Sequence, residues 1–300
     1  MRGLRTRINV GGALVCALAT CVLAVGAYGS SDARPTLFDY DRSVPLDLVL
    51  GKTTISGSVA RQKLTFNGAG SDRLGADFLH PVSGGPWPLV IWSPGFGGAR
   101  GQDLPQAQAL ARAGVASLLV DPPPGTYDTR GGCTAAHDLP RYVRYVISRR
   151  RAIDVAEKLP SVNTKRLAAV GFSYGAEITG TLAGLEHGRI GAFAFKSGRG
   201  HNTGFSQYFC PSLRDQATFT AYLAKMGVVD PVRWLPSAAH TRVLVQNGTK
   251  DELTPRADVL ALYAAAKGPK ELRWYDAGHN LNAGAAAYRQ QWLLRQLIGR

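Results

Sequence analysis

From Trp87 onward, short apolar runs alternate with segments of helical periodicity, and this alternation restricts the fold more than any other feature of the chain. Strands joined by helices of ten or more residues need right-handed crossovers, which give a mostly parallel sheet covered by helices on both faces. We therefore expect an α/β fold. The expected strands are 88–93, 115–120, 166–171, 190–195, 241–246 and 272–275, and the expected helices are 103–113, 138–158, 174–186, 256–266 and a last helix ending near Arg300.

The segments before and between these elements define the expected domain organisation. Turn formers are frequent over 30–58, which we interpret as a lead-in segment, and 59–68 and 73–81 have the pattern of a β-hairpin. A chain of 300 residues with 45% hydrophobic residues can bury one large core. We expect a single α/β domain over 59–300, with a small cap of one or two helices over 197–240.

The first 29 residues have the pattern of an export signal. A basic start with Arg2, Arg5 and Arg7 precedes an uncharged apolar run over 10–29, with small residues near its end. This pattern is typical of a secretory signal peptide, although the run is also close to the roughly 20 residues that span a membrane. We expect 1–29 to be a signal peptide, with an uncleaved membrane anchor as the alternative. The remainder is then secreted or periplasmic, or else membrane-anchored and facing outside.

Export determines how the four cysteines are interpreted. Cys16 and Cys21 lie in the apolar leader, so Cys133 and Cys210 are the two that remain in the exported part. Two cysteines in an oxidising compartment allow one pairing, and we expect a Cys133–Cys210 disulfide. On the chain-entropy model, a bridge closing a loop of this length contributes at most roughly 4–5 kcal/mol.

The chain is basic, with a formal net charge of +14 at pH 7. The leader accounts for three of these charges, and the densest remaining cluster is 149–151, after Arg141 and Arg144. No nucleic-acid-binding motif accompanies the cluster, so we interpret it as a solvated helix face and expect no nucleic-acid partner.

A nucleophile motif lies between an expected strand and an expected helix. Gly171-Phe172-Ser173-Tyr174-Gly175 matches G-x-S-x-G in the strand-turn-helix context that a nucleophile elbow requires. The glycines allow close approach of neighbouring backbone, and the turn presents the serine hydroxyl at the carboxyl edge of the sheet. This context predicts that Ser173 is a catalytic nucleophile.

A serine nucleophile needs a base and an orienting carboxylate. Asp251 follows the strand at 243–246, and His279 lies on the loop after the last expected strand, so Ser173, Asp251 and His279 occur in the order nucleophile, acid, base. No pair of the histidines shows metal-ligand spacing, so we expect no metal and no cofactor. The competing carboxylates are less well placed, and they are Asp121, Asp230 and Asp276.

The oxyanion formed by serine attack needs preorganised N–H donors. One expected donor is the backbone N–H of Tyr174, the residue after the nucleophile. The other is that of Phe96, in the glycine-rich loop 93–98 that follows the strand ending at Trp92. Gly97 and Gly98 leave space there for a substrate.

With these residues, the region from about Leu74 to Arg300 resembles α/β-hydrolase-fold serine hydrolases of the dienelactone hydrolase-like and prolyl-oligopeptidase-like branch. Pro94-Gly95-Phe96 is also similar to the oxyanion loop of cutinase-like polyester hydrolases. Two features depart from the family: a serine replaces the cysteine of dienelactone hydrolases proper, and Ser93-Pro94 replaces the His-Gly of many relatives. The matching segments are 92–98, 171–175, 248–255 and 278–280.

The sequence thus predicts an exported carboxylesterase that cleaves a small-molecule or polymeric ester and contacts a membrane only through an uncleaved leader. The alternatives are a polyester or lipid hydrolase and a catalytically silent binding protein with the same fold. Aromatic side chains of the excursion at 197–240 either line an acyl or aryl pocket or pack the excursion onto the sheet. These aromatic residues are Phe205, Tyr208, Phe209, Phe219, Tyr222 and Trp234.

Overall fold

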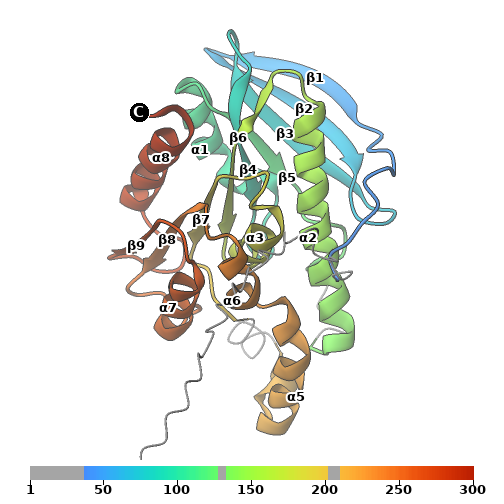
Figure 1. Ribbon diagram of the computed structural model, residues 1–300, viewed down its shortest axis with the longest axis vertical. Helices are drawn as coiled ribbons and strands as arrows, with labels where there is room; N and C mark the ends of the chain where they lie inside the picture. Colours follow the sequence, from blue (N-terminus) through green and yellow to red (C-terminus); the bar gives the residue numbers. More distant parts are fainter. Residues whose placement is uncertain (1–36, 128–132, 202–209) are drawn as a thin grey trace, which may run out of the picture. The chain divides into compact units, whose positions relative to one another are not determined.

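A computed structural model of the chain describes residues 37–127, 133–201 and 210–300 (Figure 1). The expected leader at 1–29 lies outside the described residues, as do the aromatic residues Phe205, Tyr208 and Phe209. The described residues belong to one unit, Leu37–Arg300.

Within this described part, nine strands form one mixed sheet. They are β1 (Val49–Ser56), β2 (Val59–Asn67), β3 (Arg73–Pro81), β4 (Trp87–Ser93), β5 (Ala116–Val120), β6 (Val162–Phe172), β7 (Ala192–Lys196), β8 (Arg242–Gly248) and β9 (Lys270–Tyr275). Their order is β1-β2-β3-β5-β4-β6-β7-β8-β9. Pairing is antiparallel from β1 to β5 and parallel from β5 to β9. The parallel part brings the carboxyl ends of six strands to one edge.

Helices cover both faces of this sheet (Figure 1). Their bounds are α1 (Leu104–Arg112), α2 (Ala135–Lys158), α3 (Tyr174–Glu186), α5 (Gln216–Met226), α6 (Pro231–Trp234), α7 (Arg256–Ala265) and α8 (Ala283–Ile298). Apolar side chains of α2, α3 and α7 pack on one face. Those of α1 and α8 pack on the other. The expected α/β architecture is therefore confirmed.

The strands and helices lie close to the ranges expected from the sequence, and the main element that was not expected is the strand β1. This strand lies inside 30–58, the expected lead-in, and pairs with β2 at the edge of the sheet. All eight of its residues are exposed, so the segment lacks the alternation of buried and exposed positions that marks a half-buried strand.

Helix α2 begins at Ala135, three residues before the expected start, because the Thr134 side chain caps it by accepting from the His137 N–H.

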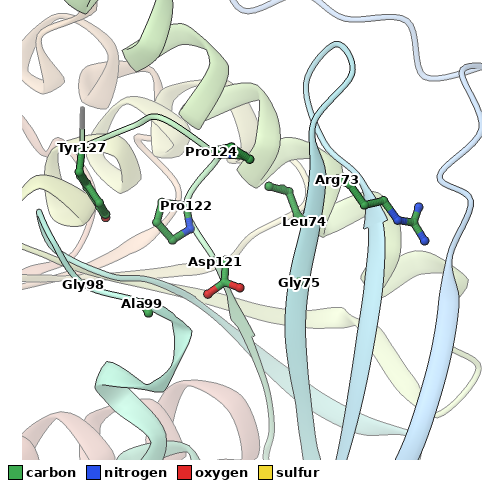
Figure 2. Close-up of a pocket in the computed structure, with 9 residues that line it drawn as sticks. All are labelled: Arg73, Leu74, Gly75, Gly98, Ala99, Asp121, Pro122, Pro124 and Tyr127. Carbon is green, nitrogen blue, oxygen red and sulfur yellow. The ribbon is translucent and has the colours of Figure 1, made fainter. Parts of the chain in front are cut away.

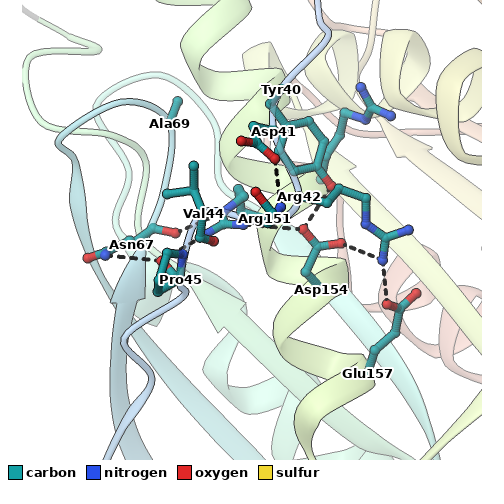
Figure 3. Close-up of polar contacts among 12 residues, drawn as sticks. Tyr40, Asp41, Arg42, Val44, Pro45, Asn67, Ala69, Arg151, Asp154 and Glu157 are labelled. Carbon is teal, nitrogen blue, oxygen red and sulfur yellow. Dashed lines mark hydrogen bonds and ion pairs between the residues drawn. The ribbon is translucent and has the colours of Figure 1, made fainter.

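The interpretation of the arginine cluster as a solvated face is wrong. Arg149 is 0% exposed and Arg151 is 2% exposed. The segment before β1 covers this side of α2, and the Arg151 guanidinium donates to the carbonyl oxygens of Val44 (2.9 Å) and Pro45 (3.0 Å) (Figure 3). Arg149 instead donates to the carbonyl oxygens of Val120 and Asp121 at the end of β5. Helical periodicity within α2 cannot reveal either of these long-range contacts.

Asp154 is the acidic centre of this cluster. Its carboxylate accepts from the Tyr40 hydroxyl at 2.8 Å and pairs with Arg42 at 3.2 Å (Figure 3). It also accepts from the Arg189 guanidinium at 2.7 Å. Arg151 lies 3.7 Å away. These contacts join the lead-in segment, α2 and the turn after α3 into one polar cluster.

The described residues of the excursion between β7 and β8 include α5 and α6. Phe219 and Tyr222 of α5 are buried against α2. Trp234 of α6 stands edge-on to Phe38, with ring centroids 5.0 Å apart. The described aromatic residues of the excursion therefore pack it onto the rest of the molecule.

Candidate active site

Ser173 occupies the sharp turn between β6 and α3, with φ 52° and ψ −122°. A side chain on Gly171 would place its Cβ 2.2 Å from the Gly175 carbonyl oxygen, and one on Gly175 would lie 2.2 Å from that of Ser93. Glycine is required at both positions because the elbow touches its own first helical turn and the loop after β4. A left-handed φ at a non-glycine residue is strained, and such strain is concentrated at functional sites.

The structure brings together the three residues of the expected triad. His279 Nε2 lies 2.8 Å from Ser173 Oγ, and its Nδ1 lies 3.0 Å from each carboxylate oxygen of Asp251. Each residue follows the carboxyl end of a parallel strand, because Ser173 follows β6, Asp251 follows β8 and His279 follows β9. Sheet topology therefore gathers residues separated by as many as 106 positions.

Asp251 is held as an oriented anion. Its side chain is 0% exposed and accepts from the backbone N–H groups of Leu253 (2.9 Å) and Thr254 (3.1 Å), besides contacting His279. Burial alone raises its pKa, but the hydrogen bond and charge of His279, followed by the backbone donors, lower the pKa of this carboxyl below its ordinary value. An ionised carboxylate accepts from Nδ1–H, which leaves Nε2 unprotonated and facing the serine.

Two residues that the sequence analysis did not identify also hold the histidine loop. The Ser197 hydroxyl, directly after β7, donates to the His279 carbonyl oxygen at 2.6 Å, and the Thr254 hydroxyl lies 3.5 Å from His279 Nδ1. The Phe172 ring lies against the imidazole, with centroids 5.2 Å apart. The position of Ser197 at a strand end was the available signal, because parallel strand ends converge on one edge.

The two expected oxyanion donors lie at the junction of the elbow and the loop after β4. Tyr174 is the first residue of α3, where backbone N–H groups have no intrahelical acceptor. Phe96 occupies a tight turn that is closed by the Gly98 N–H donating to the Gly95 carbonyl oxygen at 3.0 Å. Gly97 has φ +72°, the conformation that a type II turn requires at its third residue.

The loop that carries Phe96 is held by side chains from three places. The Tyr127 hydroxyl donates to the Gly95 carbonyl oxygen at 2.7 Å, and the Tyr145 hydroxyl donates to that of Pro94 at 3.1 Å. The Gly95 N–H donates to Gln102 Oε1 at 2.9 Å. Spacing along the sequence gave no indication of these tertiary contacts.

Tyr127 also lines a cavity of about 310 Å³ beside this loop (Figure 2). The Asp121 carboxylate forms part of its wall and is ion-paired with Arg100. The described lining includes none of the expected triad residues. It consists of Arg73, Leu74, Gly75, Gly98, Ala99, Asp121, Pro122, Pro124 and Tyr127.

A second charged cluster lies beneath the site, on the face covered by α1 and α8. Lys196, the last residue of β7, is ion-paired with Asp103, and its Nζ lies 5.1 Å from the centre of the Phe172 ring. Burial lowers the pKa of Lys196 to about 8, since it outweighs the attraction of Asp103, and burial lowers the pKa of Arg289 to about 10. The Lys196 carbonyl oxygen accepts from the Ser173 N–H at 2.8 Å, which connects this cluster to the elbow.

Cys133 and Cys210 are joined in a disulfide, with sulfur atoms 2.08 Å and Cα atoms 5.5 Å apart. Cys133 stands just before α2 and Cys210 just before the helical turn Pro211–Arg214 of the excursion. The bridge therefore ties the excursion to the start of α2, as expected from the cysteine count.

Within 37–127, 133–201 and 210–300, no three histidine, cysteine or carboxylate side chains lie close enough together to hold a metal ion. No helix of these segments combines the length and apolar character needed to cross a membrane.

Solved structures identify the architecture. No protein-family model matches the sequence, and no curated protein matches it either. Acetyl xylan esterase 1 from Thermoanaerobacterium sp. JW/SL YS485 superposes with a TM-score of 0.73 at 18% identity, covering 87% of this chain and 91% of its own. An acetyl xylan esterase from Paenibacillus sp. R4 gives 0.70 at 19% identity, covering 84% and 90%. Dienelactone hydrolase from Anabaena variabilis ATCC 29413 gives 0.57 at 17% identity, covering 80% and 99%. The chain has the α/β-hydrolase fold.

Proposed function

We propose that the protein is an exported serine hydrolase that cleaves carboxylic esters through an acyl-enzyme. Ser173 is the nucleophile, His279 the general base and acid, and Asp251 the carboxylate that orients the imidazole. The backbone N–H groups of Phe96 and Tyr174 bind the oxyanion. No metal or cofactor takes part in this scheme.

The observation that carries the proposal is the unbroken series of contacts from Asp251 through His279 to Ser173 Oγ, with the serine on a strained turn. A series of this geometry is the arrangement by which an imidazole removes the proton of a serine hydroxyl. The names of two structural neighbours, both acetyl xylan esterases, favour an ester as the substrate. The fold alone does not select a substrate.

The reaction follows from the positions of the protons. His279 Nε2 accepts the Ser173 proton while Oγ attacks the ester carbonyl carbon, and the carbonyl oxygen becomes an oxyanion. Collapse of the tetrahedral intermediate breaks the bond to the alcohol, which leaves with the proton from His279. Water then attacks the acyl-enzyme with the same histidine as base, which releases the acid and restores Ser173.

Replacing Ser173 by Ala tests the assignment. We expect hydrolysis of short p-nitrophenyl esters to fall to the background rate, because the attacking atom is lost, while circular dichroism and thermal unfolding stay close to those of the wild type. A fluorophosphonate probe should label the wild type and not Ser173→Ala. Hydrolysis at the wild-type rate in the variant would refute the assignment, and a wild type that neither reacts with the probe nor hydrolyses esters would favour a binding protein.

Polyester or lipid hydrolysis is the alternative within the same chemistry. Pro94 and Gly95 pack closely against the elbow, since a Cβ on Gly95 would lie 2.8 Å from the Phe172 ring. The next residue, Phe96, has its ring centroid 6.4 Å from that of Tyr174. An aromatic surface of this kind suits an apolar acyl or aryl group. Rates across acyl lengths and on a polyester film distinguish the two possibilities.

A further inference from the structure

The peptide between Gly95 and Phe96 is fixed by a tyrosine that belongs to neither the elbow nor the loop after β4. The Tyr127 hydroxyl donates to the Gly95 carbonyl oxygen at 2.7 Å, across 32 residues of sequence. In a planar trans peptide, the carbonyl oxygen and the following N–H point to opposite sides. A donor that holds the Gly95 oxygen on one side therefore directs the Phe96 N–H to the other.

The adjoining peptide has its own fixed partners. The Pro94 carbonyl oxygen accepts from the Tyr145 hydroxyl, and the N–H of the same peptide, which belongs to Gly95, donates to Gln102. Besides Tyr127, the Gly95 oxygen accepts from the Gly98 N–H at 3.0 Å. Among the described contacts, the Tyr127 hydroxyl is thus the side-chain group that fixes the orientation of the Gly95–Phe96 peptide.

We propose that Tyr127 is a positioning residue of the oxyanion hole, which orients and polarises the peptide whose N–H is the Phe96 donor. This inference rests on the proposed serine hydrolase function. A hydrogen bond to the carbonyl oxygen withdraws electron density from the amide, which makes its N–H a stronger donor. Orientation and polarisation both matter most when negative charge develops on the substrate oxygen, so the effect falls on the transition state.

The surroundings of Tyr127 suit this role. Its ring packs edge-on against that of Phe96, with centroids 4.9 Å apart, so ring and hydroxyl hold the same turn. Burial raises the pKa of Tyr127 well above its ordinary value, and the neighbouring Tyr145 adds to this effect. The hydroxyl therefore keeps its proton at neutral pH and donates to the Gly95 carbonyl oxygen.

Tyr127→Phe tests the proposal, because it removes the hydroxyl and keeps the ring. We expect kcat for p-nitrophenyl acetate to fall about 10- to 100-fold, less than the loss of a complete oxyanion donor, with KM changed less than about 3-fold. Binding of a short alkylboronic acid, which forms a tetrahedral adduct with the serine, should weaken by the same factor as kcat. Fluorophosphonate titration corrects each rate for the number of competent sites.

Tyr142→Phe is the matched control, because Tyr142 is also a tyrosine with a hydrogen-bonded hydroxyl, but that hydroxyl contacts Thr181 at 2.8 Å. We expect its kcat and boronic acid affinity to stay within about 2-fold of the wild type. Equal losses in both variants, or an unchanged kcat in Tyr127→Phe, would overturn the role of Tyr127 alone. If the wild type neither hydrolyses esters nor reacts with the probe, the proposed function fails and this role fails with it.

Discussion

The triad candidates and the arginine cluster of α2 are both buried and polar, but their partners differ in kind. His279 connects one carboxylate to one hydroxyl, in a series that ends on an atom suited to attack a substrate. The guanidinium of Arg151 and the carboxylate of Asp154 each contact several partners from different segments. The first arrangement is suited to move a proton. The second holds parts of the chain together, so burial of charge does not by itself indicate catalysis.

Asp251→Asn, a change within the triad candidates, should have the largest effect and should lower activity. An amide at this position favours the wrong imidazole tautomer, so we expect kcat for short esters to fall by about 10⁴-fold with the fold retained. Stopped assays with the purified protein measure this loss. Asp276→Asn is the control, because that carboxylate lies three residues from His279 yet is 77% exposed and paired with Lys250. A larger loss in Asp276→Asn would reverse the assignment of the acid.

Asp154→Asn should give the opposite result, a loss of stability without a loss of chemistry. Removing the charge leaves the buried Arg151 guanidinium without its carboxylate and takes one of three carboxylates from Arg189, so we expect the free energy of unfolding to fall by about 3–5 kcal/mol. Urea unfolding measures the change, and kcat per competent site should stay within about 2-fold. Glu157→Gln is the matched control, since Glu157 pairs with Arg42 and Arg189 but is 32% exposed, and should cost no more than about 1 kcal/mol. Similar losses in both variants would contradict the central role of Asp154.

The same comparison explains what the sequence could predict. The order of Ser173, Asp251 and His279 was readable because each follows a strand, and parallel strands end at one edge of the sheet. The burial of Arg151 was not, since it depends on a covering segment about 100 residues away, and neither was that of Arg149, which depends on contacts with the end of β5. Local sequence patterns predict helices, strands and strand ends, but they do not reveal which side chains a distant segment of the chain buries.

β1 and Tyr127 are the other two features that sequence patterns could not predict. β1 forms an edge strand whose residues are exposed on both faces, so no alternation indicates it. The Tyr127 contact with Gly95 joins two loops, and the residue type alone is ordinary for a loop. By contrast, the G-x-S-x-G motif predicted the two glycines, and a Cβ at either position would lie 2.2 Å from a backbone oxygen.

Lys196 offers a smaller, pH-dependent test near the triad. Its pKa in the folded protein is about 8, below the ordinary lysine value of 10.5, because burial disfavours the charged form. Between these two values the unfolded chain binds more protons than the folded one, so this group makes the free energy of unfolding rise with pH, by up to about 3 kcal/mol. Lys196→Arg stays charged and should lack the rise. In urea titrations from pH 8 to pH 10, we expect the free energy of unfolding of the wild type to rise relative to that of the variant. If the two free energies change in parallel with pH, the lowered pKa of Lys196 is contradicted.

Arg149→Met should have the smallest effect on the free energy of unfolding. It distinguishes the contribution of Arg149 from that of Arg151, which lies on the same helix. Arg149 Nη2 donates to the Val120 and Asp121 carbonyl oxygens at 3.1 Å each, but Nε and Nη1 have no hydrogen-bond partner among the described residues, and no described carboxylate pairs with the group. Replacing a buried charge of this kind by an apolar side chain relieves desolvation and offsets the lost hydrogen bonds, so we expect the free energy of unfolding to change by no more than about 1 kcal/mol. Arg151→Met, measured in the same urea series, should cost more because three backbone carbonyls and Asp154 lose their partner. A greater loss in Arg149→Met would mean that carbonyl oxygens alone hold a buried guanidinium as firmly as a carboxylate does.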